Sequence, residues 1–321
     1  MSTADLDTNK FGIGSNPRWC IILKKTISSN TWLDQISRKS FTFYDLLIYV
    51  KMISEREEHN MSIVENLIQR LKDEKEDNIK GGIYNKLQVD FAYNSNHIEG
   101  SKLTHDQTRY IFETHTVGTE PTRVDDVIEA VNHFRCFDYI LDTYNEPLTE
   151  DYIKDLHRIL KTGTFDSAKS YAVVGDYKKY ANEVGPLQTT SPKNVAKDIS
   201  ELLNMYQGNM SFDDILDFHA RYEKIHPFYD GNGRTGRLIM FKQCLDNDIV
   251  PFIIEDKFKG EYNRGLYEWQ SGREKGYLRD TCLFMQDYMN QVLDYFKIGD
   301  LELDNEDLDL NSSDDFDIGD D

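Results

Sequence analysis

Apolar side chains recur every three or four residues along most of the chain, and this spacing is the feature that most constrains the fold. Such a period places the apolar groups on one face of an α-helix. Thr104, Thr149 and Ser211 stand where N-terminal helix caps are expected, and Gly100 stands where a helix would end. The pattern predicts a mainly α-helical fold, with a helix starting after Thr104 and others near residues 43–50, 63–71, 84–98, 127–134, 153–160, 192–206, 212–225, 232–246, 256–270 and 276–296.

One segment departs from the helical period. Residues 171–185 contain β-forming side chains, short alternations and glycines. This composition predicts one small β-hairpin. The expected architecture is therefore a helical bundle with a single hairpin, preceded by N-terminal helices.

The overall charge and composition exclude several classes of protein. The net charge is −20, which argues against nucleic acid or an anionic membrane as a bulk partner. No apolar run reaches the ~20 residues of a membrane span, and the first residues contain no signal-peptide core. The four cysteines are far apart in sequence and form no C-x-x-C pair, as expected for thiols in a reducing compartment. A cytoplasmic protein is predicted.

The negative charge is concentrated at the C-terminal end. Residues 300–321 hold eleven Asp or Glu and no Lys or Arg, which predicts a disordered acidic tail. Residues 1–20 are expected to be loosely ordered, and residues 21–82 to form an N-terminal helical region. The main domain is then predicted to span residues 83–299.

The densest cluster of chemical groups lies between two predicted helices, in the stretch His226-Pro-Phe-Tyr-Asp-Gly-Asn-Gly-Arg-Thr-Gly-Arg237. Its glycines fall near the start of a helix, where backbone N–H groups are unpaired and the helix dipole is positive. Glycine also lets a ligand approach the backbone closely. The turn is therefore predicted to bind an anion, and phosphate fits it best.

The side chains around this anion site suit phosphoryl or nucleotidyl transfer. Arg234 and Arg237 are three residues apart on one helix, so both can face one ligand. Asp230 is a hard oxygen ligand for magnesium, and His226 is a base that titrates near neutral pH. The turn also matches the dinucleotide fingerprint G-x-G-x-x-G, but that motif must follow a β-strand, and here a helix is predicted. A purely structural glycine-rich turn is the remaining alternative.

These twelve residues resemble the complete signature of the Fic domain family, H-P-F-x-D-G-N-G-R-x-x-R. Most members with this signature transfer AMP from ATP to a hydroxyl side chain of a protein. The resemblance extends over roughly residues 85–275. It implies a Fic-type helical bundle, with the hairpin acting as a flap over the site.

The resemblance also implies a role for each residue of the turn. His226 is the base, and Asp230 holds magnesium. The residues assigned to ATP are Gly231, Asn232 and Gly233 around the α-phosphate, Arg234 and Arg237 on the outer phosphates, and Tyr262 against the adenine. On its spacing alone Tyr262 is equally expected in the core. The related Doc kinases have lysine at the position of Gly233, so this glycine favours AMP transfer.

Two residues outside the turn also fit the family pattern. The family usually has arginine where Lys178 stands, at the start of the flap. His157 is expected to be a structural histidine.

A further resemblance lies upstream, in Ser95-Asn-His-Ile-Glu-Gly100. It is similar to the family's inhibitory motif, (Ser/Thr)-x-x-x-Glu-(Gly/Asn), and implies an inhibitory helix over about residues 83–99. Glu99 is expected to pair with Arg237 and so to occupy the guanidinium that would hold the γ-phosphate. Ser95, one turn earlier, is expected to hydrogen-bond Glu99. An ordinary glutamate at a helix end is the alternative.

The sequence therefore predicts a magnesium-dependent protein adenylyltransferase that Glu99 inhibits. ATP is the co-substrate, and the partner is a protein with a Ser, Thr or Tyr hydroxyl. Modification of the chain itself and a homodimer are left open. Two other functions also stay open: removal of AMP, alone or together with its transfer, and a nucleotide-binding scaffold without catalysis.

Overall fold

The computed structural model describes residues 61–184 and 187–299. The chain divides into two units, Met1–Met61 and Ser62–Asp321, and the signature turn lies in the second. Some predictions fall outside the described residues: those for 1–20, for most of 21–82 and for 300–321.

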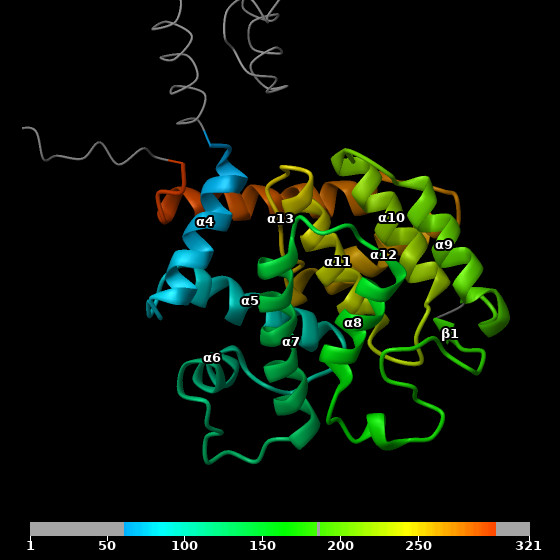
Figure 1. Cartoon of the computed structure of the whole chain (residues 1–321), viewed down its shortest axis with the longest axis horizontal. Coiled ribbons are helices and arrows are strands. Elements are labelled where there is room, and N and C mark those ends of the chain that lie inside the picture. Colours follow the sequence, from blue (N-terminus) through cyan, green and yellow to red (C-terminus); the bar gives the residue numbers. More distant parts are fainter. Residues whose placement is uncertain (1–60, 185–186, 300–321) are drawn as a thin grey trace, which may run out of the picture. The chain divides into compact units, whose positions relative to one another are not determined.

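The described part of the second unit is mainly α-helical, as predicted, and its helices surround a central one (Figure 1). Three 3-10 turns accompany the helices: η2 (Asp166–Ala168), η3 (Pro192–Asn194) and η4 (Asp256–Phe258). The α-helices are α4 (Ile63–Glu76), α5 (Ile83–Ile98), α6 (His105–Thr114), α7 (Val124–Thr143), α8 (Glu150–Lys161), α9 (Val195–Met205), α10 (Phe212–Ile225), α11 (Asn232–Asp246), α12 (Lys259–Gln270) and α13 (Gly276–Tyr295).

The helix starts follow the capping residues read from the sequence. Thr104 and Ser211 accept backbone N–H groups in capping boxes at α6 and α10, and Thr149 caps α8. The predicted starts at residues 192 and 256 are 3-10 turns, and the α-helices follow three residues later. Most helices were therefore predictable to within one turn.

The hairpin is smaller than predicted and lies further along the chain. Strand β1 (Glu183–Val184) pairs antiparallel with β2 (Leu187–Gln188), and residues 171–182 form no strand. Backbone N–H groups in this earlier segment are used elsewhere: that of Gly175 binds His157 and that of Lys178 binds the Pro227 carbonyl. An N–H that bonds to another segment cannot serve a β ladder.

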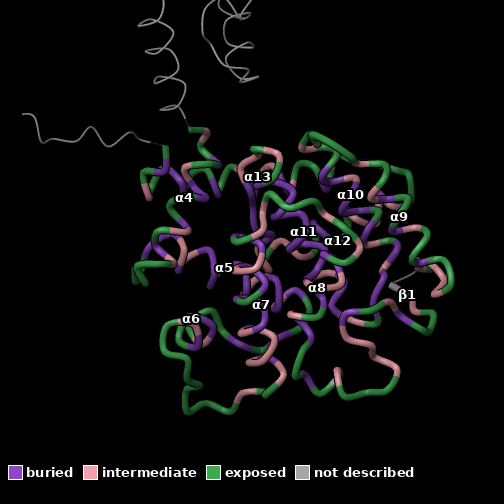
Figure 2. Tube along the Cα trace, viewed as in Figure 1, coloured by how far each residue is buried: buried purple, intermediate pink, exposed green. Residues whose placement is uncertain are grey.

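Helix α11 is buried on all sides, as the run of buried residues through the centre of Figure 2 shows. It packs against α10, α8, α5 and α7. Rings of Phe91, Phe137 and Phe241 meet in the core between α5, α7 and α11, with centroids 5.2 and 5.5 Å apart. This packing brings the C-terminal end of α5 to the first turn of α11, where the signature lies.

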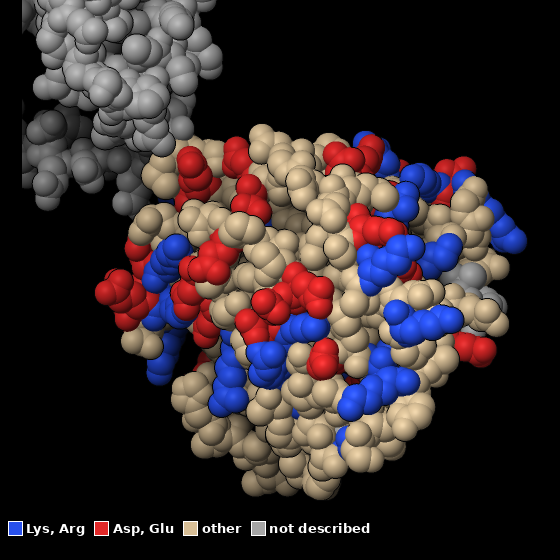
Figure 3. All heavy atoms as spheres, turned by 45° about the vertical axis from the view of Figure 1, so that its right-hand side comes forward, with Lys and Arg blue, Asp and Glu red and all other residues tan. Residues whose placement is uncertain are grey.

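The described helices include none that is long and apolar enough to cross a bilayer. On the face drawn in Figure 3, acidic and basic side chains lie close to one another over much of the surface.

Candidate active site

The signature turn joins α10 to α11 through two residues in the left-handed region. His226 follows the last residue of α10 with a φ of 52°, and Gly231 precedes α11 with a φ of 81°. The buried amide of Asn232 closes the loop between them: Oδ1 accepts the Phe228 N–H at 2.8 Å, and Nδ2 donates to the Phe228 carbonyl at 2.9 Å. The side chain of Asn232 is thus engaged within the turn and fixes its conformation.

A cavity of about 650 Å³ opens beside the first turn of α11. Its lining includes His226, Gly233, Arg237, Glu99 and Tyr262. The first N–H groups of a helix have no partner within it, and the positive end of the helix dipole lies there. One cavity of ligand-binding size therefore collects predicted site residues from α5, the turn, α11 and α12.

Glu99 and Arg237 form the predicted ion pair at this cavity. Nη2 of Arg237 lies 2.8 Å from Oε1 of Glu99. Glu99 is the C-terminal cap of α5, and its carboxylate lies directly against Gly233. Burial alone would raise the pKa of Glu99, but the Arg237 guanidinium outweighs it and lowers that pKa. Glu99 thus occupies both the guanidinium and the space beside the glycine.

Ser95 contacts the arginine, whereas the sequence had suggested a hydrogen bond to Glu99. Its Oγ accepts from Nε of Arg237 at 3.1 Å, and its carbonyl accepts from Nη2 at 2.9 Å. A guanidinium has five N–H donors, so it can bind a hydroxyl, a carbonyl and a carboxylate at the same time. The hydroxyl and the carboxylate therefore both bind Arg237.

Arg234 belongs to a different set of contacts. Its Nη1 lies 2.6 Å from Oε2 of Glu129 in α7, and its Nη2 lies 3.3 Å from Oδ2 of Asp230. Nζ of Lys161 in α8 lies 2.6 Å from a carboxylate oxygen of each of these acids. Two cations and two carboxylates alternate in a closed network. Glu129 and Lys161 were not predicted, because only helix packing brings them to the signature.

Asp230 is ionised in this network. Burial alone would raise its pKa, but the Arg234 and Lys161 cations lower it to about 2. The described residues contain no group of three or more His, Cys, Asp or Glu that could hold a metal. Magnesium commonly binds one or two carboxylates and completes its shell with phosphates and water. Asp230 therefore fits magnesium as one protein ligand of an ion that a nucleotide would complete.

His226 has the protonation state of a base. Burial lowers the pKa of its ring, and the nearby Lys178 ammonium lowers it further, to about 4. Its Nδ1 is shielded from solvent. The imidazole is therefore neutral at pH 7, with Nε2 as the nitrogen left to take a proton.

Tyr262 is both a wall of the cavity and part of the core. Its side chain is 1% exposed, and its hydroxyl lies 2.7 Å from Nε2 of His219. The guanidinium carbon of Arg237 lies 5.9 Å from the centre of the ring. No pattern in the sequence had pointed to His219, whose role here is to anchor the tyrosine.

His157 links the start of the flap segment to the signature turn. Nδ1 accepts the Gly175 N–H at 2.9 Å, so Nε2 carries the proton and donates to the Asp230 carbonyl at 3.1 Å. The ring stacks on Phe228 with centroids 3.8 Å apart. Burial lowers the pKa of His157 to about 4. These contacts fit the structural role expected of this residue.

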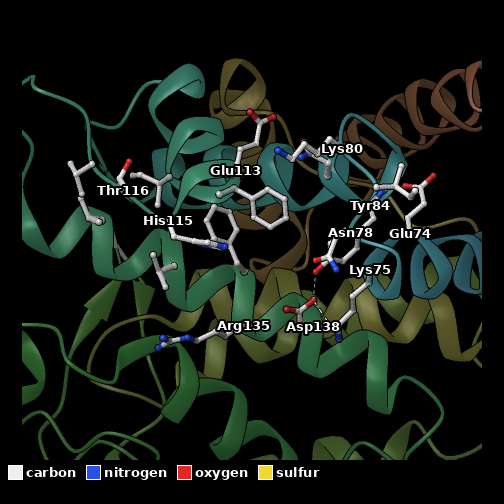
Figure 4. Close-up of a pocket in the computed structure, with 18 residues that line it drawn as sticks. Glu74, Lys75, Asn78, Lys80, Tyr84, Glu113, His115, Thr116, Arg135 and Asp138 are labelled. Carbon is white, nitrogen blue, oxygen red and sulfur yellow. Dashed lines mark hydrogen bonds and ion pairs between the residues drawn. The ribbon is translucent and has the colours of Figure 1, made fainter.

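A larger cavity, of about 730 Å³, lies at the N-terminal end of α5, away from the signature (Figure 4). The rings of Tyr84, Phe112 and Phe134 line it together with charged groups such as Lys75 and Asp138. The Tyr84 hydroxyl donates to Asp138 at 2.7 Å. None of the predicted site residues lines this cavity, and no motif in the sequence had indicated it.

Comparison with known proteins places the signature in a recognised domain. Residues 147–244 match the model of the Fic/DOC family. Protein adenylyltransferase Fic of Aedes aegypti is 27% identical over 220 residues, which are 65% of this chain and 41% of the relative. Protein adenylyltransferase fic-1 of Caenorhabditis elegans is 28% identical over 200 residues, which are 59% of this chain and 38% of the relative. The chain thus spans about two fifths of the length of these curated relatives.

Solved structures share the fold. A Fic domain containing signalling protein from Bacteroides thetaiotaomicron superposes with a TM-score of 0.58 at 23% identity, covering 72% of this chain and 96% of the other. Fic-1 from C. elegans superposes with a TM-score of 0.53 at 18% identity, covering 79% and 78%. The predicted Fic-type helical bundle is confirmed. Residues 147–244 are therefore similar to the Fic/DOC family, and the described part of the chain shares the fold of solved Fic proteins.

Proposed function

We propose that this chain is cytoplasmic and transfers AMP from ATP to a Ser, Thr or Tyr side chain of a target protein and of itself. The similarity to two protein adenylyltransferases supports this activity. The observation that carries the proposal is the neutral His226 at the cavity where the Arg237 guanidinium and the first turn of α11 meet. A base, a cation and free N–H groups at one cavity are the parts that nucleotidyl transfer needs.

In the proposed reaction, the target hydroxyl oxygen attacks the α-phosphorus of ATP, and Nε2 of His226 takes the hydroxyl proton. A new P–O bond joins AMP to the target as the P–O bond to pyrophosphate breaks. The N–H groups of residues 231–233 hold the α-phosphate, and Arg234 and Arg237 balance the charge of the outer phosphates. Because little covalent chemistry falls to the protein, these groups act by positioning and by stabilising charge.

Asp230 and Tyr262 complete the proposed ATP site. Asp230 would hold magnesium together with the phosphates, and the ion supplies positive charge to the phosphate oxygens. Tyr262, already fixed by His219 at the cavity wall, would lie against the adenine.

Glu99 is proposed to restrain the transfer. It holds the Arg237 guanidinium and lies against Gly233, which are two of the groups assigned to the phosphates. ATP could then bind only with its outer phosphates displaced from the in-line geometry that transfer requires. Release of Glu99 would complete the site.

Removal of AMP from a modified protein is a second candidate, favoured by the same contact. A carboxylate against Gly233 lies beside the proposed α-phosphate position and could orient a water molecule for hydrolysis. Incubating an AMP-modified protein with the chain and assaying free AMP separates this activity from transfer.

The proposed function is tested by intact mass after incubation with ATP and magnesium, with His226→Ala as the matched variant. We expect added AMP on the wild-type chain or on an added protein. His226→Ala should bind ATP with an unchanged Kd but transfer AMP about 10²–10⁴-fold more slowly, because it lacks the base. Transfer by His226→Ala within about threefold of wild type would sink the role assigned to this residue.

A further inference from the structure

Lys178 is a buried lysine that has no acidic partner among the described residues. Its side chain is 3% exposed. Burial lowers its pKa to about 8. A cation in such a place needs other acceptors, because an unpaired buried charge is costly. Lys178 has three: Nζ donates to Oδ1 of Asn182 at 2.7 Å, to Oγ1 of Thr189 at 2.8 Å and to the Ile225 carbonyl at 3.4 Å.

Two of these acceptors flank the hairpin. Asn182 directly precedes β1, and Thr189 directly follows β2. The Thr189 hydroxyl also donates to the Asn182 carbonyl at 2.7 Å. The Lys178 ammonium therefore bridges the two residues that flank the first strand pair, Glu183 and Gln188. Strands only two residues long have little stability of their own, so contacts at the base decide where they lie.

The other contacts of this group lead to the catalytic turn. Nζ of Lys178 reaches the Ile225 carbonyl, and its backbone N–H donates to the Pro227 carbonyl at 2.9 Å. Nδ2 of Asn182 donates to the Phe228 carbonyl at 3.3 Å. Ile225 and Pro227 are the residues on either side of His226. The residues that flank the hairpin are thus hydrogen-bonded to the chain immediately before and after His226.

We propose that Lys178 is a positioning residue whose ammonium group clamps the β1–β2 hairpin to the backbone on both sides of His226. This inference rests on the proposed function, since a hairpin fixed next to His226 would hold a target hydroxyl within reach of Nε2 of His226. The three N–H donors of the Lys178 ammonium match three neutral acceptors, whereas an arginine here would bring five donors in a planar arrangement. The ammonium charge also acts on the ring of His226, against the opposing charges of Glu99 and Asp230.

Three variants separate these effects. Lys178→Met removes the donors and the charge while keeping a similar length. Thr189→Val removes one acceptor but keeps the shape of the side chain and leaves the charge in place. Lys179→Met removes a neighbouring exposed lysine and serves as the control.

The readouts are amide hydrogen exchange in β1 and β2, and the pKa of His226 from NMR titration. Lys178→Met should speed exchange in the hairpin about fivefold or more, since it removes at least one net hydrogen bond. It should also raise the pKa of His226 by about one pH unit, because a nearby cation is lost. Thr189→Val should speed the exchange without moving this pKa, and Lys179→Met should change neither.

These readouts need no catalytic turnover, so they test the positioning role of Lys178 separately from the proposed AMP transfer. If the wild-type chain transfers no AMP, the proposed function fails, but exchange and the pKa still report on Lys178. If it does transfer AMP, Lys178→Met should slow transfer about 10–100-fold, through misplacement of the target, with the Kd for ATP unchanged. Unchanged exchange and pKa in a folded Lys178→Met would overturn the proposal. Should that variant not fold, unchanged exchange in Thr189→Val would overturn it.

Discussion

The two arginines of the signature are three residues apart on α11 and almost equally buried, with 4% and 2% of their side chains exposed, but their acidic partners come from different regions. Arg234 meets Glu129 of α7 and Asp230 of its own turn, and Lys161 of α8 pairs with both acids. Arg237 faces the end of α5, where one carboxylate, Glu99, meets it. Identical side chains in one motif are therefore held by unlike surroundings.

The two regions differ in how their acids are held: those that pair with Arg234 belong to a network of four charges, whereas Glu99 pairs with Arg237 from a helix end. Around Arg234, removal of one acid leaves two buried cations, Arg234 and Lys161, to share the other. Around Arg237, the carboxylate belongs to a helix cap, and 35% of its side chain is exposed. It also faces the negative end of the α5 dipole, which disfavours it. We therefore expect the first region to stay closed and the second to release its acid more easily.

The largest effect on stability is expected from Glu129→Ala. Arg234 and Lys161 would then share only Asp230, and breaking a buried charge pair costs about 3–5 kcal/mol. Glu99→Ala should cost less, because Glu99 is 35% exposed and Ser95 would still accept two hydrogen bonds from Arg237. Urea unfolding measures both free energies. Equal losses for the two variants would remove the distinction between the regions.

A smaller effect is expected from the pH dependence of Asp230. Its folded-state pKa of about 2 lies below the ordinary 3.8, so the ionised carboxylate stabilises the fold above about pH 4. That contribution is lost as the pH falls toward 2. Since 43% of the side chain is exposed, we expect about 1 kcal/mol between wild type and Asp230→Asn at pH 7. A difference that stays constant down to pH 2.5 would contradict the assignment of this charge to the network.

The contrast between the two arginines also explains what the sequence could predict. Helix faces and caps such as Ser211 and Thr104 depend on residues within one or two turns, so the helices and the signature turn were predictable. The Glu99–Arg237 pair was predictable because both residues lie in recognised motifs. Glu129 carries no local signal, since it reaches Arg234 only through the packing of α7 on α11.

The hairpin was misplaced for a related reason. β-Forming residues in the segment 171–182 suggested strands there, but the N–H groups of Gly175 and Lys178 bond to His157 and Pro227 instead. Hydrogen bonds to distant segments override local propensity. The strands lie further along the chain, at Glu183–Val184 and Leu187–Gln188.

The most direct test of the account compares AMP transfer by wild type, Glu99→Gly and the double variant Glu99→Gly/Arg237→Ala, each with its fold confirmed by circular dichroism. If Glu99 restrains the site through Arg237, Glu99→Gly should transfer AMP about 5–150-fold faster than wild type, the range of a coupling of about 1–3 kcal/mol. Adding Arg237→Ala should abolish that gain, since the freed guanidinium is what the phosphates bind. Equal rates for wild type and Glu99→Gly, or a gain that persists without Arg237, would contradict it.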